Sequence, residues 1–245
     1  MNRDNWPLST RLFIAFVRGY TGGSLILFGL FLALGPFDVA KLGLPNAGTL
    51  AWDAALCLAF CAQHSVMVRR SFRQRAERYV PRHLGGVLYA LLSGVMLYAL
   101  TLLWQESPSV LVKLEGAARW IARGIFVAAL PGFVWSATAI PHFDPFGVGP
   151  IKDRLRGREP RSLPFAIRGP YRWVRHPQYF FSLVLLWAYP DLTADRLLLN
   201  GIITAWIVLG SVLEERDLVE EFGEDFVAYQ RDVPMLIPWR GRRPF

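Results

Sequence analysis

Two clusters of polar residues flank the last apolar stretches of this 245-residue chain. Arg175, His176 and Tyr179 open one short apolar run, and Glu214 and Glu215 close the next. Membrane segments rarely carry charge, so charge at both ends of a membrane hairpin needs an explanation. An antiparallel hairpin would bring these two ends together into a small polar chamber. We interpret the chamber as a site for a polar ligand at the membrane face.

The same residues allow a plainer interpretation. Arg175 and one of the two glutamates could form an ion pair that only pins the hairpin. Adjacent residues on a helix point about 100° apart, so Glu214 and Glu215 cannot both face a ligand. The sequence does not decide which of them does.

A second feature follows the glutamates. Leu218, Phe222, Phe226 and Tyr229 recur at helical spacing with acidic residues between them, and Gly223 interrupts the pattern. Such a segment is typical of an amphipathic helix lying on the bilayer. Alternatively, it could cover the polar chamber and stack its aromatic rings on a ligand.

The composition is that of a membrane protein. Hydrophobic residues make up 53% of the chain, with nine Trp and seventeen Phe, which exceeds the 45–50% or so of a soluble domain. The net charge of +8 comes from arginines gathered in a few loops, which indicates orientation in a membrane rather than binding of nucleic acid. The four histidines lack the spacing of metal ligands, so we predict no metal site.

Six stretches approach the roughly 20 apolar residues that a membrane-spanning helix needs. They are residues 12–34, 50–68, 85–104, 118–140, 178–189 and 196–213. The fifth is short and is expected to form a tight helical hairpin with the sixth. Basic residues gather in the loops after the second and fourth stretches, which predicts that both termini are cytoplasmic.

These features predict an all-α integral membrane protein with about six transmembrane helices, a C-terminal helical hairpin and a pocket on the cytoplasmic side. No repeat or flexible linker divides the chain. We therefore predict a single membrane domain over residues 1–245, with N-terminal helices in 1–115 and the functional core in 116–245.

The polar clusters resemble a known superfamily. Arg-His-Pro-x-Tyr at 175–179, Glu-Glu-Arg-x-Leu at 214–218, Phe-Gly-x-x-Phe at 222–226 and Val-Pro at 233–234 are similar to the isoprenylcysteine carboxyl methyltransferase and phospholipid methyltransferase superfamily. The stretches 62–67 and 142–147 resemble the bacterial methanethiol S-methyltransferases within it.

The resemblance implies a membrane methyltransferase that uses S-adenosyl-L-methionine. Its cofactor would bind in the cytoplasmic pocket. The residues that it implies for this cofactor are Gly169, Pro170, Tyr171, Val174, His176, Tyr179, Phe222 and Tyr229. Arg175, Glu214 and Glu215 would be catalytic: Arg175 would stabilise a thiolate and a glutamate would receive its proton. His64 and His142, in the two further stretches, are expected to contact the substrate.

The acceptor remains open between two kinds of molecule. A small thiol such as methanethiol is one, and a lipid-like acceptor, either a prenylcysteine carboxylate or a phospholipid amine, is the other. Asp232 before Val-Pro, and Phe180 and Phe181 after the Arg-His-Pro-x-Tyr motif, depart from the prenylcysteine enzymes. A small-molecule transporter is the non-enzymatic alternative, although no inverted repeat supports it. The bacterial inner membrane is the expected location.

Overall fold

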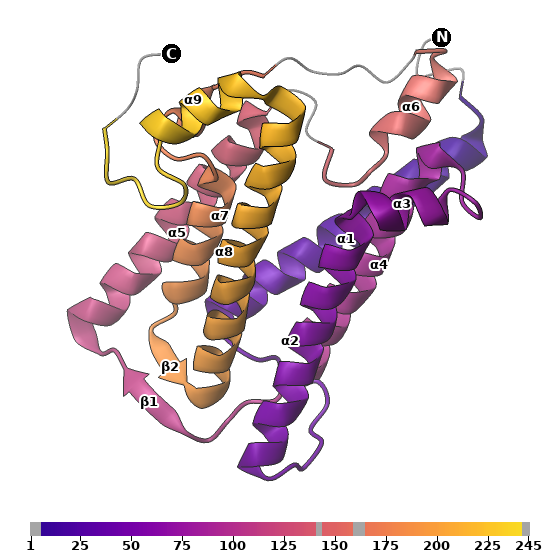
Figure 1. The fold of residues 1–245 in the computed structure, drawn as a ribbon. Coiled ribbons are helices and arrows are strands. Elements are labelled where there is room, and N and C mark those ends of the chain that lie inside the picture. The colour runs from indigo at the N-terminus through magenta and orange to yellow at the C-terminus, as the bar shows by residue number, and fades with distance from the viewer. Residues whose placement is uncertain (1–5, 141–143, 159–164, 242–245) are drawn as a thin grey trace. The chain divides into compact units, whose positions relative to one another are not determined.

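The computed structural model describes residues 6–140, 144–158 and 165–241, apart from the side chain of Arg70, and these residues are mostly helical (Figure 1). The helices are α1 (Leu8–Leu34), α2 (Asn46–Val68), α3 (Arg70–Ala76), α4 (Arg82–Leu103), α5 (Gly116–Ala139), α6 (Gly149–Leu155), α7 (Pro177–Trp187), α8 (Ala194–Phe222) and α9 (Glu224–Asp232). A 3-10 helix, η2 (Gly169–Arg172), and two strands, β1 (Val110–Lys113) and β2 (Asp191–Thr193), complete the described elements.

Five of these helices, α1, α2, α4, α5 and α8, are long and apolar enough to cross a membrane. Within their most apolar windows only 22% to 33% of residues are buried in the protein, so most of their surface is left for lipid. The chain is therefore an integral membrane protein. The fifth stretch is short, as predicted: α7 has 11 residues, or about 16 Å, which is less than the hydrocarbon core of about 30 Å.

The mostly helical structure is consistent with the predicted all-α class. It also contains one short pair of strands, β1 and β2, which pair antiparallel with Val112 opposite Leu192 and Lys113 opposite Asp191. The helix that carries the last span extends beyond it, because α8 continues from residue 213 to Phe222. Gly223, at φ 58°, then separates α8 from α9, as its place in the sequence predicted.

The chain forms two compact units. The first comprises residues 1–106 and 144–162, and the second comprises 107–143 and 163–245. The prediction of a single membrane domain concerns how these units are joined, and it stays a prediction.

In the first unit, α4 packs against α1, α2 and α6. A core of Trp6, Ile14, Val17, Val87, Val148 and Ile151 joins α1, α4 and α6. Asp144 accepts a hydrogen bond from the backbone N–H of Gly149 and so caps the start of α6. Gly147 lies against Gly86 of α4 with φ 64°, a conformation in which glycine alone carries no steric penalty.

In the second unit, α7 packs between α5 and α8, and α9 packs on α8. Gly132 of α5 faces the ring of Phe181 so closely that an added Cβ would lie 2.3 Å from the ring. Pro177 starts α7, where its missing N–H has no helical partner to lose. Thr193 caps α8 by accepting a hydrogen bond from the backbone N–H of Arg196.

The contact between Gly147 and Gly86 gives a first test. Replacing Gly147 by Ala would place Cβ 2.1 Å from the Gly86 backbone and force a side chain into positive φ. We expect the free energy of unfolding to fall by more than about 2 kcal/mol in thermal or denaturant unfolding of detergent-solubilised protein. Gly85→Ala, in the same helix with no atom within 4 Å of its added Cβ, should change it by no more than about 1 kcal/mol. Equal effects of both variants would contradict this packing.

Candidate active site

A buried carboxylate, that of Glu215, joins the start of α7 to the ends of α8 and α9. Its Oε1 accepts hydrogen bonds from Arg175 Nε at 2.7 Å and from His176 Nε2 at 3.1 Å. Its Oε2 accepts from Arg175 Nη2 at 2.9 Å and from Gln230 Nε2 at 2.8 Å. Two donors on each oxygen leave this carboxylate well satisfied. We call these four residues the Glu215 network.

The third nitrogen of the Arg175 guanidinium also makes hydrogen bonds. Its Nη1 donates to the carbonyl oxygens of Gln230, at 3.0 Å, and of Val233. The backbone N–H groups of Arg175 and His176 donate to the carbonyls of Pro234, at 2.9 Å, and Met235, at 3.1 Å. The C-terminal segment is thereby fastened along the residues that precede α7.

The burial of this pair decides what it contributes. The side chains of Arg175 and Glu215 are only 10% and 9% exposed. An exposed ion pair contributes about 0–1 kcal/mol, whereas removal of one partner of a buried pair leaves a desolvated charge. Arg175 and Glu215 therefore form a buried ion pair, which links the start of α7 to α8.

Glu214 lies in a different environment from its neighbour. Its side chain is 47% exposed, and Oε2 accepts a hydrogen bond from the Tyr179 hydroxyl at 2.9 Å. The rings of Tyr179 and His176 stack with centroids 5.4 Å apart and planes 11° apart. Nδ1 of His176 lies 3.8 Å from the same Glu214 oxygen. Glu214 and Tyr179 thus form the accessible edge of the Glu215 network, and the buried His176 ring lies behind Tyr179.

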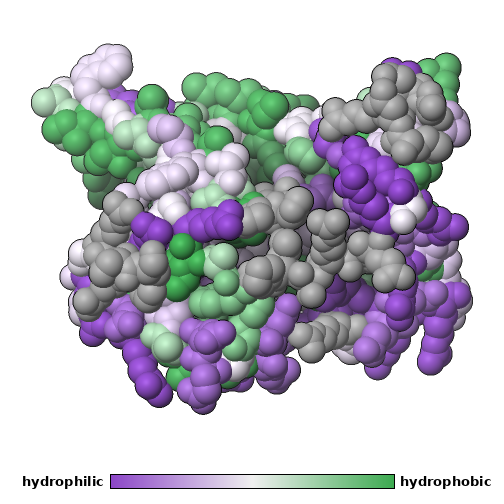
Figure 2. All heavy atoms as spheres, turned by 90° about the horizontal axis from the view of Figure 1, so that it is seen from above, coloured by the Kyte–Doolittle hydropathy of each residue, from purple (hydrophilic) through white to green (hydrophobic). Residues whose placement is uncertain are grey.

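The surroundings of that edge are polar. The last turns of α8 and the helix α9 carry exposed charged residues. In the view from above, hydrophilic side chains are visible on this end of the unit (Figure 2).

The aromatic residues expected to cover a ligand pack on one another in this structure, and their contact with a ligand stays a prediction. Phe226 and Tyr229 are buried in a cluster with Phe165 and Phe222, and the Phe165 ring lies 5.3 Å from Phe222 and 5.5 Å from Tyr229. The Tyr229 hydroxyl donates to the carbonyl oxygen of Tyr171 at 2.6 Å. Burial raises the pKa of both tyrosines, so Tyr229 keeps the proton that it donates. This cluster anchors α9 to η2.

The other expected cofactor residues lie in or beside η2. Gly169 adopts φ 53° and sits against Trp135 and Ala139 of α5, where a Cβ would approach within 3.2 Å. Pro170 and Val174 are buried, and both line a pocket of the second unit. The structure therefore gathers the residues predicted from 169 to 229 within one unit.

The structure does not test the two residues predicted to contact the substrate. His64 belongs to the first unit, where it contacts the Tyr89 hydroxyl, with Nε2 at 2.5 Å, and the Phe60 ring. His142 lies outside the described residues. Both roles stay predictions. No metal-binding group of three or more His, Cys, Asp or Glu residues occurs in the part of the chain that the structure describes.

Sequence reasoning missed part of this site. Gln230 and the carbonyl of Val233 bond to Glu215 and Arg175, yet neither was singled out. A glutamine in an amphipathic helix and a backbone carbonyl carry no distinctive sequence signal. Only the Val-Pro motif at 233–234 marked the segment, and it did so without indicating which atoms would be used.

The sequence matches the family described as NnrU protein over residues 54–238. The chain belongs to the NnrU family. It is 37% identical over 218 residues to a methanethiol S-methyltransferase of Pseudomonas sp. (strain GM41(2012)), covering 83% of each chain. Methanethiol S-methyltransferase 1 of Bradyrhizobium diazoefficiens is 31% identical over 241 residues, which cover 93% of this chain and 83% of the relative.

A more distant relative is Nurim of Rattus norvegicus, 30% identical over 180 residues, with 69% of this chain and 68% of that protein covered. No solved structure gives a significant match. The resemblance that the motifs predicted, to this superfamily and to its methanethiol S-methyltransferases in particular, is confirmed.

The unequal burial of the two glutamates leads to a prediction about stability. Glu215→Gln would leave the Arg175 guanidinium buried without its counter-charge, so the free energy of unfolding should fall by about 3–5 kcal/mol. Glu214→Gln alters a half-exposed group and should lower it by less than about 1 kcal/mol. Thermal and denaturant unfolding of the two purified variants would measure this. Similar losses in both would contradict the assignment of Glu215 as the buried partner.

Proposed function

We propose that this chain is an integral membrane methyltransferase that uses S-adenosyl-L-methionine to methylate a small thiol such as methanethiol. The observation that carries the proposal is its 31–37% identity to several methanethiol S-methyltransferases over most of the chain. The family match over residues 54–238 spans both polar clusters, from which the Glu215 network is built. Membrane helices and a polar site in one unit fit this activity.

The residues present fit the proposed cofactor. S-adenosyl-L-methionine has a sulfonium cation, an amino acid end and an adenine ring. Glu214 offers a half-exposed carboxylate beside the stacked rings of Tyr179 and His176, and carboxylates and aromatic faces are the groups that bind such cations. Glu214, Tyr179 and His176 would therefore hold the cationic part, with Gly169 and Tyr171 toward the remainder.

When bound, this cofactor would supply a methyl group carried on a sulfonium sulfur. The acceptor sulfur would form the new bond to this methyl group with its own electron pair, and the electron pair of the broken bond would stay on the cofactor sulfur as a neutral thioether. The thiol proton would go to water. A thiolate is already a strong nucleophile, so the protein must chiefly align the reactants and exclude water. Arg175 and Glu215 already use their polar atoms in hydrogen bonds within the protein, which suits them to positioning the residues that contact the reactants. In this proposal Glu214 is the carboxylate that contacts the reactants.

We also propose that both termini are cytoplasmic. The helix α7 is short by itself, but the residues on either side of it extend its path. Before α7, η2 packs near the C-terminal end of α5, and after α7, β2 pairs with β1, which directly precedes the N-terminal end of α5. Residues 169–191 thus run along the whole of α5 and make a sixth crossing. Glu214 lies twenty residues after Ala194, or about 30 Å along α8, which is one hydrocarbon thickness. The site would then lie at the cytoplasmic face.

The activity itself can be tested directly. Membranes containing the protein, supplied with methanethiol and S-adenosyl-L-methionine labelled in the methyl group, should release labelled dimethyl sulfide. Membranes from cells without the protein are the control. Absence of labelled product from folded protein, across a range of methanethiol concentrations, would refute the proposed function.

The role of Glu214 can be separated from that of its neighbours. Glu214→Gln should weaken binding of S-adenosyl-L-methionine about tenfold or more, because a charged contact is worth about 1.5–3 kcal/mol. S-adenosylhomocysteine lacks the sulfonium charge, so its affinity should fall less. Calorimetry on purified protein measures both, with Glu221→Gln, an exposed change on the same helix, as the matched control. Equal losses for the two ligands would rule out a contact between Glu214 and the sulfonium.

A further inference from the structure

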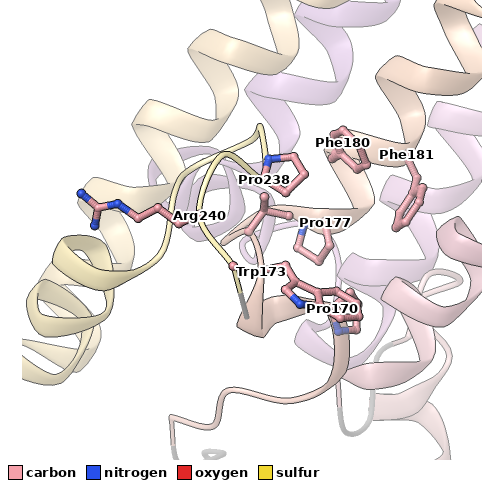
Figure 3. Close-up of a pocket in the computed structure, with 9 residues that line it drawn as sticks. Pro170, Trp173, Pro177, Phe180, Phe181, Pro238 and Arg240 are labelled. Carbon is pink, nitrogen blue, oxygen red and sulfur yellow. The ribbon is translucent and has the colours of Figure 1, made fainter. Parts of the chain in front are cut away.

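An apolar pocket of about 300 Å³ opens in the second unit beside the start of α7 (Figure 3). The rings of Trp173, Phe180 and Phe181 and those of three prolines line it. Arg240 also belongs to its wall, but its side chain points away from the other labelled residues (Figure 3). The chemistry of the pocket is therefore that of aromatic and aliphatic carbon, which is the usual lining of a small-molecule site.

The pocket and the Glu215 network share one stretch of chain. Val174 and Pro177 line the pocket, whereas Arg175 and His176 between them bond to Glu215. The C-terminal segment, which pairs with Arg175 and His176 through the carbonyls of residues 234 and 235, continues to Pro238 in the pocket wall. An apolar compartment thus adjoins the polar site across a single segment.

The volume is larger than the smallest thiol needs. Methanethiol has two heavy atoms. If each occupies about 30 Å³, as a water molecule does in the liquid, the molecule needs a volume on the order of 60 Å³. The pocket would hold about five times as much. Its aromatic rings also offer flat faces, which a two-atom molecule cannot use but a ring can.

We propose that this pocket binds the apolar body of the methyl acceptor, and that the acceptors include thiols carrying an aromatic ring, such as phenylmethanethiol. This inference rests on the proposed function, and the bond changes are those given above. Each additional buried methylene should strengthen acceptor binding about fourfold. A ring-bearing thiol should accordingly show a KM at least about tenfold below that of methanethiol.

Gly132 lies behind one wall of the pocket, although it does not itself line the pocket. It lies under the Phe181 ring, and the Cβ of an alanine there would stand 2.3 Å from the nearest ring atom. The ring would have to move, and Phe181 is one wall of the pocket. Gly124, in the same helix, has no atom within 4 Å of an added Cβ. Gly132→Ala and Gly124→Ala therefore form a matched pair in which one substitution alone disturbs the pocket.

The experiment compares methanethiol and phenylmethanethiol as acceptors for the full-length protein in membranes. Both should be methylated by the wild type. Gly132→Ala should lower kcat/KM for phenylmethanethiol about tenfold or more, in line with the cost of a misfitting methylene, and change that for methanethiol less than about threefold. Gly124→Ala should change neither.

Binding provides a readout that does not depend on turnover. Calorimetry with benzyl methyl sulfide, the expected product, should show binding to the wild type and about tenfold weaker binding to Gly132→Ala, with affinity for S-adenosylhomocysteine unchanged. If methanethiol is methylated while phenylmethanethiol is not, the inference is wrong and the proposed function stands. If Gly132→Ala weakens S-adenosylhomocysteine instead, the pocket belongs to the cofactor and the inference is overturned. Failure with both thiols overturns the proposed function and the inference with it.

Discussion

The burial of the Glu215 carboxylate is the constraint on which the rest of the second unit depends. A carboxylate taken out of water costs several kcal/mol unless donors replace its hydration. Here Arg175, His176 and Gln230 supply four hydrogen bonds, and they come from the residues before α7 and from α9. Because each donor must stay in place to satisfy the charge, α7, α8, α9 and the C-terminal segment are held in one arrangement. The aromatic cluster around Phe226 and the pocket wall follow from that arrangement.

The position of Glu215 also determines what Glu214 can do. Neighbouring residues on a helix differ by about 100° in direction, so a glutamate that points into the Glu215 network turns the one before it toward the surface. Glu214 is accordingly half exposed and meets only the edge of the network, through Tyr179. A single pair of acidic residues thus provides one buried structural charge and one accessible charge. A ligand cation can be balanced there without breaking the contacts that keep the helices together.

The sequence predicted this site better than it predicted its surroundings. The spacing of Arg175, His176, Tyr179 and the glutamates was sufficient to place them together, because a short hairpin leaves few other arrangements. Hydropathy located five helices able to span a membrane and indicated that α7 is short, but it gave no sign of the strands that follow. The strand pairing that follows α7 depends on partners about 80 residues away. The aromatic residues of 222–229 were open to two interpretations because Phe165, on which they pack, lies far away in the sequence.

Within the segment from Trp173 to Pro177, a buried charged site adjoins an apolar pocket. Arg175 and His176 face buried charge, while Trp173, Val174 and Pro177 face an apolar pocket. A thiol is suited to such a boundary, because its neutral form resembles a hydrocarbon whereas its reactive form is an anion that polar groups must stabilise. An amine or a carboxylate would carry its charge into the apolar side and lose hydration there. The presence of polar and apolar residues within these five positions therefore favours an acceptor that can be uncharged on entry and ionised at the site of transfer.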